Sequence, residues 1–200
     1  LRKNLIMCGI VGYIGKEQAA PILLEGLARL EYRGYDSAGI CVAENGVLDV
    51  AKCKGRLKNL AAMTENGALL HGTAGIGHTR WATHGEPNDI NSHPHVSQNG
   101  KVALVHNGII ENYLEIREFL EEKGVQFTSQ TDSEVVAQLL EYCLGLDEVH
   151  CMQDAIYMVL HRIEGAYAFG IVCADDPERI YAARKDAPLL LGYGDGCNFI

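Results

Sequence analysis

The pattern of apolar and polar positions changes period several times along the 200 residues, and each period predicts an element. Apolar or alternating β-branched runs are typical of strands, whereas apolar residues three and four apart are typical of helices. The runs predict strands over residues 8–14, 37–44, 47–53, 75–80, 101–110, 167–174, 179–184 and 188–193. The helical spacing predicts helices over residues 18–32, 57–64, 112–123, 133–144 and 153–163.

The order of these elements favours an α+β fold. Consecutive predicted strands are joined by short turns, such as the "ENG" at residues 44–46, which indicate antiparallel hairpins. The predicted helices need apolar faces to cover, so we expect a layered sandwich of helices and antiparallel sheets.

Composition and charge narrow the classes of partner. The chain is 48% hydrophobic and 22% charged, with a formal net charge of −9. An acidic surface repels phosphate backbones, so we expect no nucleic-acid partner. No apolar run reaches the ~18 residues of a membrane span, and "LRKNLIM" is too short for a signal-peptide apolar region. We expect a cytoplasmic protein without a membrane partner.

The seven cysteines are Cys8, Cys41, Cys53, Cys143, Cys151, Cys173 and Cys197. None forms a C-x-x-C pair, and their spacing is irregular. We therefore expect reduced thiols, most of them acting as small core hydrophobes.

Cys8 has two interpretations. It opens an apolar run and can be a core cysteine at the start of a strand. It also follows Met7, a candidate start residue, and precedes Gly9, which would leave room beside the sulfur for a ligand and for a strained backbone. Removal of Met7 would give Cys8 a free α-amine with a pKa of roughly 7.7–8.0 beside a thiol of about 8.5. One residue would then supply both a nucleophile and a base.

Residues 77–88, "GHTRWATHGEPN", contain a second candidate site. Arg80 lies at a predicted strand end, where an arginine can bind a carboxylate through two parallel hydrogen bonds, or form a surface salt bridge. Trp81 is the single tryptophan and lies in a polar segment, which a mobile lid would explain.

Two further motifs have both a structural and a functional interpretation. Asn107 and Gly108 follow an apolar strand, and they form either a turn or an oxyanion hole made of a side-chain amide and a backbone N–H. Thr131 and Glu134 have the spacing of a capping box, and Asp132 can also cap or pair with a ligand ammonium group.

The histidines do not indicate a metal site. His93 and His95 flank a proline in a polar loop, but no nearby cysteine or carboxylate completes a zinc ligand set. His84 and His106 are interpreted as hydrogen-bonding residues around the other motifs.

Taken together, these motifs resemble a family. The strings "MCGIVGYIG", "LEYRGYDSAGI", "GHTRWATHGEPN", "VHNGIIENY" and "QTDSEVV" are similar in order and spacing to the class II glutamine amidotransferases. The resemblance covers residues 7–200. "EYRGYDSAG" and "HTRWATHG" favour the branch that supplies ammonia for hexosamine synthesis, with the glutaminase domains of other branches as alternatives.

The resemblance implies the N-terminal-nucleophile fold, a four-layer αββα sandwich of two antiparallel sheets between helix layers. It also implies hydrolysis of the glutamine side-chain amide through a thioester. Cys8 would be the nucleophile and its α-amine the proton shuttle, while Asn107 and Gly108 would hold the oxyanion.

The resemblance assigns the remaining site residues to substrate binding. Arg80 would bind the α-carboxylate of glutamine and Asp132 its α-ammonium group. Arg33 would lie near the nucleophile without contacting the substrate. The loop expected to close over glutamine contributes Trp81, Thr83 and His84.

No cofactor and no metal are implied. The expected partners are L-glutamine and a sugar isomerase domain that aminates fructose 6-phosphate, and a homodimer is compatible with the resemblance.

We expect residues 1–7 to be an N-terminal extension, either a propeptide or residues upstream of the natural start, and residues 8–200 to be a domain shortened at its C-terminus. The alternative is a catalytically silent glutamine-binding module, because Cys8 is not N-terminal in this sequence.

Overall fold

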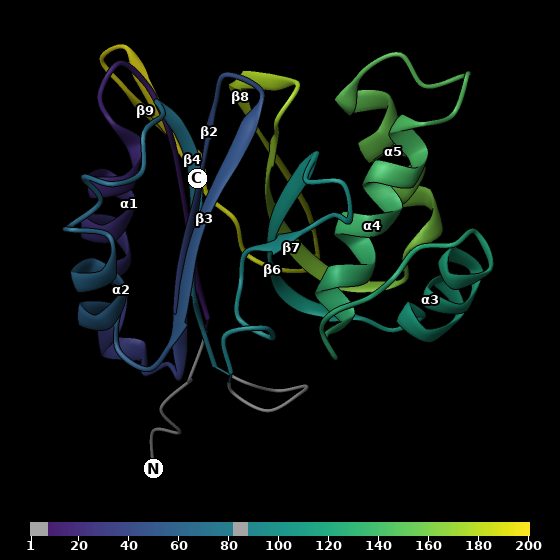
Figure 1. Cartoon of the computed structure of the whole chain (residues 1–200), viewed down its shortest axis with the longest axis horizontal. Helices are drawn as coiled ribbons and strands as arrows, with labels where there is room; N and C mark the ends of the chain where they lie inside the picture. Colours follow the sequence, from purple (N-terminus) through teal and green to yellow (C-terminus); the bar gives the residue numbers. More distant parts are fainter. Residues whose placement is uncertain (1–7, 82–87) are drawn as a thin grey trace.

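Two antiparallel sheets packed face to face form the centre of the molecule, and helices cover both outer faces (Figure 1). The structure is a computed structural model that describes residues 8–81 and 88–200. One sheet has the order β3-β2-β4-β1-β10-β9 and the other the order β5-β6-β7-β8. The four-layer αββα sandwich predicted from the resemblance is confirmed.

The six-stranded sheet is built from the two ends of the chain. Its strands are β1 (Gly9–Ile14), β2 (Ser37–Glu44), β3 (Val47–Lys54), β4 (Ala74–Arg80), β9 (Gly192–Gly194) and β10 (Cys197–Phe199). The central pair is antiparallel, with Gly9 opposite Thr79. The start of β1 therefore lies beside the end of β4.

Two helices cover the outer face of this sheet, α1 (Ala19–Ala28) and α2 (Leu57–Met63). Apolar residues three and four apart on α1 point inward, and Leu23 and Leu27 are fully buried together with Leu60 of α2. Helical spacing thus places one apolar face of each helix on the sheet.

The four-stranded sheet and its helices form the other half of the molecule. Its strands are β5 (His95–Val96), β6 (Val102–Ile110), β7 (Gly165–Cys173) and β8 (Asp176–Lys185). The helices of this half are α3 (Tyr113–Glu122), α4 (Asp132–Leu144) and α5 (Met152–Arg162). On α4 the predicted inward face is confirmed, because Val136, Leu139, Leu140 and Cys143 are all buried.

The two sheets meet through a small apolar layer. Ile76 of β4 and Val105 of β6 are fully buried in it, with Cys41 of β2 and Val172 of β7 beside them. This contact determines how the end of β4 faces the end of β6, and so it sets the geometry of the site described below.

Several predicted boundaries are wrong. The strand expected over residues 188–193 is only β9, and its first apolar residues are exposed, Leu190 at 82% and Leu191 at 62%. The apolar run predicted a buried strand here, but these leucines do not pack against the core. The helix expected over residues 18–32 ends at Ala28, and a separate 3-10 turn covers Glu31–Arg33.

Asn112 precedes the first residue of α3, but its side chain makes no capping hydrogen bond to that helix. Its amide instead donates to the carbonyl of Arg162 and accepts from the N–H of Glu164, which ties the helix start to the segment before β7. The short strands β5 and β10 were not predicted, because two or three residues carry too little periodicity to be recognised.

All seven cysteines are free thiols, as predicted. Cys41, Cys143 and Cys173 are buried in the core, Cys53 and Cys197 are half-buried against it, and Cys151 is exposed. None of the helices in residues 8–81 and 88–200 combines the length and apolar character needed to cross a membrane.

Candidate functional site

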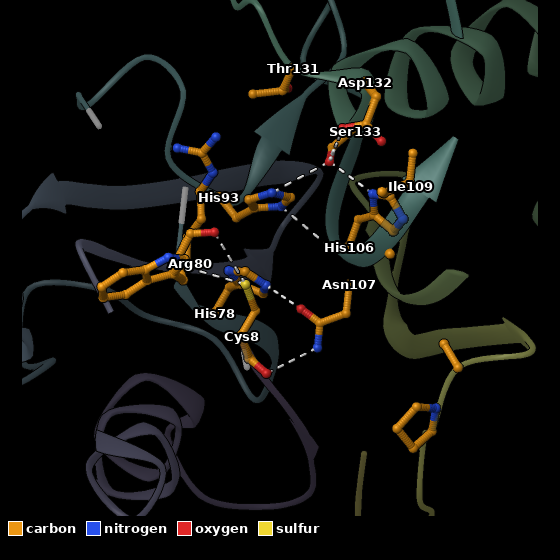
Figure 2. A pocket seen from close by; sticks show the side chains of 14 residues that line it. Cys8, His78, Arg80, His93, His106, Asn107, Ile109, Thr131, Asp132 and Ser133 are labelled. Atoms are coloured by element: carbon orange, nitrogen blue, oxygen red, sulfur yellow. Dashed lines mark hydrogen bonds between the residues drawn. The ribbon is translucent and has the colours of Figure 1, made fainter. Parts of the chain in front are cut away.

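A cavity of about 320 Å³ lies where the two sheets and the start of α4 meet (Figure 2). This volume is at the lower end of the range for small-molecule sites. The cavity is lined by six of the residues to which the resemblance assigns a catalytic or substrate-binding role, namely Cys8, Arg80, Trp81, Asn107, Gly108 and Asp132. Thr83 and His84 lie outside the described residues, as does the side chain of Arg33.

The antiparallel pairing of β1 with β4 brings Cys8 to the end of β4. Its Sγ accepts a hydrogen bond from the Trp81 N–H at 3.2 Å, and its thiol contacts the Trp81 carbonyl oxygen at 3.7 Å. Burial raises the pKa of the Cys8 thiol, while the Trp81 N–H and the Arg80 charge oppose that effect. The thiol is therefore protonated at neutral pH and needs a base to become a nucleophile.

Gly9 does not provide the open space expected beside the sulfur. A Cβ built at this position would lie 2.6 Å from Cδ1 of Leu30 and 2.9 Å from Oγ1 of Thr79. Its backbone does not adopt a left-handed conformation either. The glycine allows the side chain of Leu30 to pack closely against the start of β1, so the interpretation of Gly9 as open space for a ligand is wrong.

Asn107 lies within β6, so the turn interpretation of Asn107 and Gly108 is wrong. Its Nδ2 donates to the carbonyl oxygen of Cys8 at 3.3 Å, and its Oδ1 lies 2.8 Å from Nε2 of His78. Figure 2 shows this amide between the two groups. The arrangement places a side-chain amide donor next to the candidate nucleophile.

Gly108 has a positive φ of 128°, a conformation that L side chains rarely adopt. A Cβ there would lie 2.0 Å from the carbonyl oxygen of Ala166 on β7. Only glycine fits this approach of β6 to β7, and its backbone faces the cavity next to Asn107.

Arg80 and Asp132 place opposite charges in the same cavity. Arg80 is only 5% exposed, so the interpretation as a surface salt bridge is wrong. Burial lowers the pKa of its guanidinium, an effect that Asp36, Cys8 and Asp132 oppose; an arginine nevertheless remains charged at neutral pH. One carboxylate and one guanidinium can recognise the two charged groups of an amino acid.

Asp132 is oriented by the first turn of α4. Half of the predicted capping box is present. The side chain of Thr131 accepts from the N–H of Glu134 at 3.3 Å, but the Glu134 carboxylate accepts from the N–H groups of Thr128 and Ser129 rather than from that of Thr131. Oδ2 of Asp132 accepts from the N–H of Ile110 at 2.8 Å, which ties the helix start to the end of β6. The positive end of the helix dipole favours a carboxylate at this position.

Histidines surround the cavity, and sequence reasoning gave two of them, His78 and His93, no role in it. The sequence could have indicated His78, because residues two apart on a strand share a face and Arg80, two residues later, was already a candidate site residue. His106, expected as a hydrogen-bonding residue, contacts Oγ of Ser133 at 2.9 Å through Nδ1. Burial lowers the pKa of both His78 and His106 to about 4, so both rings are neutral at pH 7.

His93 and His95 form hydrogen bonds to other protein groups. His95 contacts Oγ1 of Thr131 at 3.0 Å, and Nδ1 of His93 accepts from the N–H of His106 at 3.3 Å. In the described part of the chain, no group of three or more His, Cys, Asp or Glu residues has the arrangement of a metal site.

Comparison with known proteins identifies the family. A family model described as a glutamine amidotransferase domain matches residues 78–199. The chain belongs to the glutamine amidotransferase domain family. It is 61% identical over 194 residues to the glutamine–fructose-6-phosphate aminotransferase [isomerizing] of Caldanaerobacter subterraneus, and 52% identical to that of Clostridium tetani. In both cases the match covers 97% of this chain and 31% of the relative, so the chain spans about a third of their length.

Solved structures agree with this glutamine amidotransferase assignment. The glutamine phosphoribosylpyrophosphate amidotransferase of B. subtilis is similar with a TM-score of 0.79 and 29% identity, covering 95% of this chain and 40% of that one. A structure described as the allosteric regulatory enzyme of purine biosynthesis has a TM-score of 0.78 at 31% identity, with the same coverage.

Proposed function

We propose that this glutamine amidotransferase domain hydrolyses the side-chain amide of L-glutamine with Cys8 as nucleophile. The observation that carries the proposal is the single cavity in which Cys8, the Asn107–Gly108 pair and the charged residues Arg80 and Asp132 all lie. The two charged side chains would hold the α-carboxylate and α-ammonium groups of glutamine. The amide would then extend toward the sulfur.

The chemistry proceeds in two balanced steps. Sγ of Cys8 attacks the amide carbon, and the carbonyl oxygen becomes an oxyanion held by the Asn107 side chain and the Gly108 N–H. The C–N bond breaks, ammonia leaves with the thiol proton, and a thioester remains. Water then attacks the thioester, which releases glutamate and restores the thiol.

The base for the first step is the α-amine of Cys8 once this residue is N-terminal. Its pKa of roughly 7.7–8.0 suits proton transfer from a thiol of raised pKa. While residues 1–7 are attached, the same nitrogen is a peptide amide without a lone pair available as a base.

For the longer protein, we propose that the ammonia aminates fructose 6-phosphate in glucosamine 6-phosphate synthesis. The names of the relatives support this proposal, as does the high identity across 97% of the chain. A sugar isomerase domain would be the partner that receives the ammonia. The proposed cytoplasmic location is supported by seven free thiols.

Replacement of the nucleophile tests the proposal. We expect Cys8→Ala to abolish glutamate release from L-glutamine, whereas Cys151→Ala, which changes an exposed thiol, should retain it. Glutamate is measured with an enzyme-coupled assay, and glutamine binding by calorimetry. Continued turnover by Cys8→Ala would show that the assignment of the nucleophile is wrong.

The role of the α-amine needs a separate comparison, between the chain as given and a chain that begins at Cys8. Loss of a positioned base typically costs 10²–10⁴-fold in rate, so we expect the longer chain to be slower by about that factor while binding glutamine equally well. Mass spectrometry verifies both N-termini. Equal rates would contradict the α-amine mechanism, and binding without turnover by both chains would favour the alternative of a silent glutamine-binding module.

A further inference from the structure

The side-chain amide of Asn107 is held at both ends by groups from two other segments of the chain (Figure 2). Its Nδ2 lies 3.3 Å from the carbonyl oxygen of Cys8, and its Oδ1 lies 2.8 Å from Nε2 of His78. A carbonyl oxygen only accepts hydrogen bonds, so the NH₂ group must face Cys8 and the amide oxygen must face His78. The amide oxygen also only accepts, so the proton of the His78 ring must lie on Nε2.

His78 is well placed to impose this orientation. It belongs to the central strand β4, is 1% exposed, and packs against the ring of His93 with centroids 4.3 Å apart and the ring planes tilted by 32°. Burial lowers the pKa of His78 to about 4, so at neutral pH the ring has a single N–H. With that proton on Nδ1, Nε2 would accept instead of donating, and the Asn107 amide would turn its oxygen toward the carbonyl of Cys8.

We propose that His78 is a positioning residue, whose Nε2–H holds the amide oxygen of Asn107 so that the NH₂ group faces the nucleophile. One N–H of that group binds the Cys8 carbonyl, and the second is left for the oxyanion. The inference deepens the proposed function and rests on Asn107 acting as an oxyanion donor. A turned amide would present an oxygen to the developing negative charge, so a missing donor at this point costs rate rather than substrate affinity.

A matched pair of substitutions isolates the donor. His78→Gln places an amide N–H at the end of a side chain that reaches toward Asn107, whereas His78→Met has nearly the same shape without a donor. We expect His78→Met to lower kcat by about 10²-fold, the usual cost of one oxyanion donor, with KM almost unchanged. His78→Gln should restore kcat to within a few-fold of the parent chain.

A double-mutant cycle with Asn107→Ala separates positioning from a general loss of structure. If His78 acts through Asn107, His78→Met should cause no further fall in kcat once the amide is absent. Equal losses in the Gln and Met variants, a rise in KM in step with the loss of kcat, or full additivity with Asn107→Ala would each overturn the proposal.

Nitrogen NMR gives a readout that does not depend on turnover, using the chain as given. Long-range ¹⁵N–¹H spectra should show the Nε2–H tautomer of His78 at neutral pH, and the Asn107 NH₂ group should exchange slowly with solvent. That exchange should be fast in His78→Met and slow in His78→Gln. An Nδ1–H tautomer would overturn the inference even for an active chain, whereas a chain beginning at Cys8 that shows these NMR signatures without turnover would contradict the proposed function alone.

Discussion

At the scale of single residues, the cavity pairs a buried cation with a buried anion. Arg80 and Asp132 are 5% and 7% exposed, so water screens neither charge strongly. A site built for charged groups rejects ligands that lack them, because its own groups are then left without compensation. Recognition of the amino-acid end of the substrate should therefore depend on both side chains.

We expect Arg80→Ala to weaken glutamine binding by more than ~2 kcal/mol, as for the loss of one partner of a buried charge pair. Arg80→Lys should recover only part of this loss, because an ammonium group cannot form two parallel hydrogen bonds with a carboxylate. Calorimetric titration with L-glutamine measures both variants. An unchanged dissociation constant in Arg80→Ala would remove the residue from the binding site.

Gly108 and Gly124 offer a matched test of backbone constraint. Both have positive φ, 128° and 88°, but only Gly108 has a backbone atom within 4 Å of a built Cβ. Gly124→Ala should lower the free energy of unfolding by about 1–2 kcal/mol, because alanine is strained at positive φ even where no other atom is in contact. Gly108→Ala should cost clearly more, because β6 must separate from β7. Urea denaturation measures both, and equal losses would contradict the steric argument.

At the scale of elements, the loop before β5 is held against β3 of the other sheet by hydrogen bonds from Lys52 and by one between Asp89 and the N–H of Lys54. Nζ of Lys52 on β3 donates to the carbonyl oxygens of Ile90, Ser92 and Pro94, at 3.3, 2.9 and 3.1 Å. Burial lowers the pKa of Lys52 to about 8. The same loop carries His93, which lines the cavity, so the hydrogen bonds of Lys52 connect the edge strand β3 to the site.

We expect Lys52→Met to destabilise the fold by about 1–3 kcal/mol, because it leaves carbonyl oxygens without a donor. It should also raise KM, since the loop that presents His93 loses three of its hydrogen bonds to β3. Lys54→Met is the control, because this exposed lysine lies two residues further along the same strand. If both variants unfolded at the same urea concentration as the parent chain, the three hydrogen bonds would contribute nothing measurable.

At the scale of the whole molecule, the buried histidines make stability depend on pH. The pKa values of His78 and His106 are lowered to about 4, against about 6.5 in an unfolded chain. Between these values the unfolded state binds more protons, so the stability present above pH 6.5 is lost as the pH falls toward 4. His93 and His95, whose pKa values are also lowered by burial, act in the same direction.

We therefore expect the free energy of unfolding to fall between pH 6.5 and pH 4, with His78 and His106 each contributing about 1–2 kcal/mol of the loss at pH 5. Urea denaturation at a series of pH values measures the slope. His106→Gln should make the slope shallower, because one proton-binding group is removed from the unfolded chain. A stability that is constant across this range would show that the histidines titrate normally in the folded protein.

Local sequence was enough to predict the elements with strong periodicity and to identify the motif residues. The bounds of β2 were predicted without error, and the buried face of α4 followed from its spacing. These features depend on neighbours within a few residues, because side-chain direction repeats every two residues in a strand and every 3.6 in a helix. The motif strings likewise indicated the family before any geometry was known.

Which of these residues contact one another became clear from the folded structure alone. The contact of His78 with Asn107 joins strands of two different sheets, 29 residues apart in the chain, and Trp81 reaches Cys8 across 73 residues. Whether Arg80 lay on the surface or in a cavity, and whether Asn107 formed a turn or a strand, depended on these long-range contacts. Local periodicity says which face of an element is buried but not which partner covers it, because pairing between distant strands is set by the packing of the whole core.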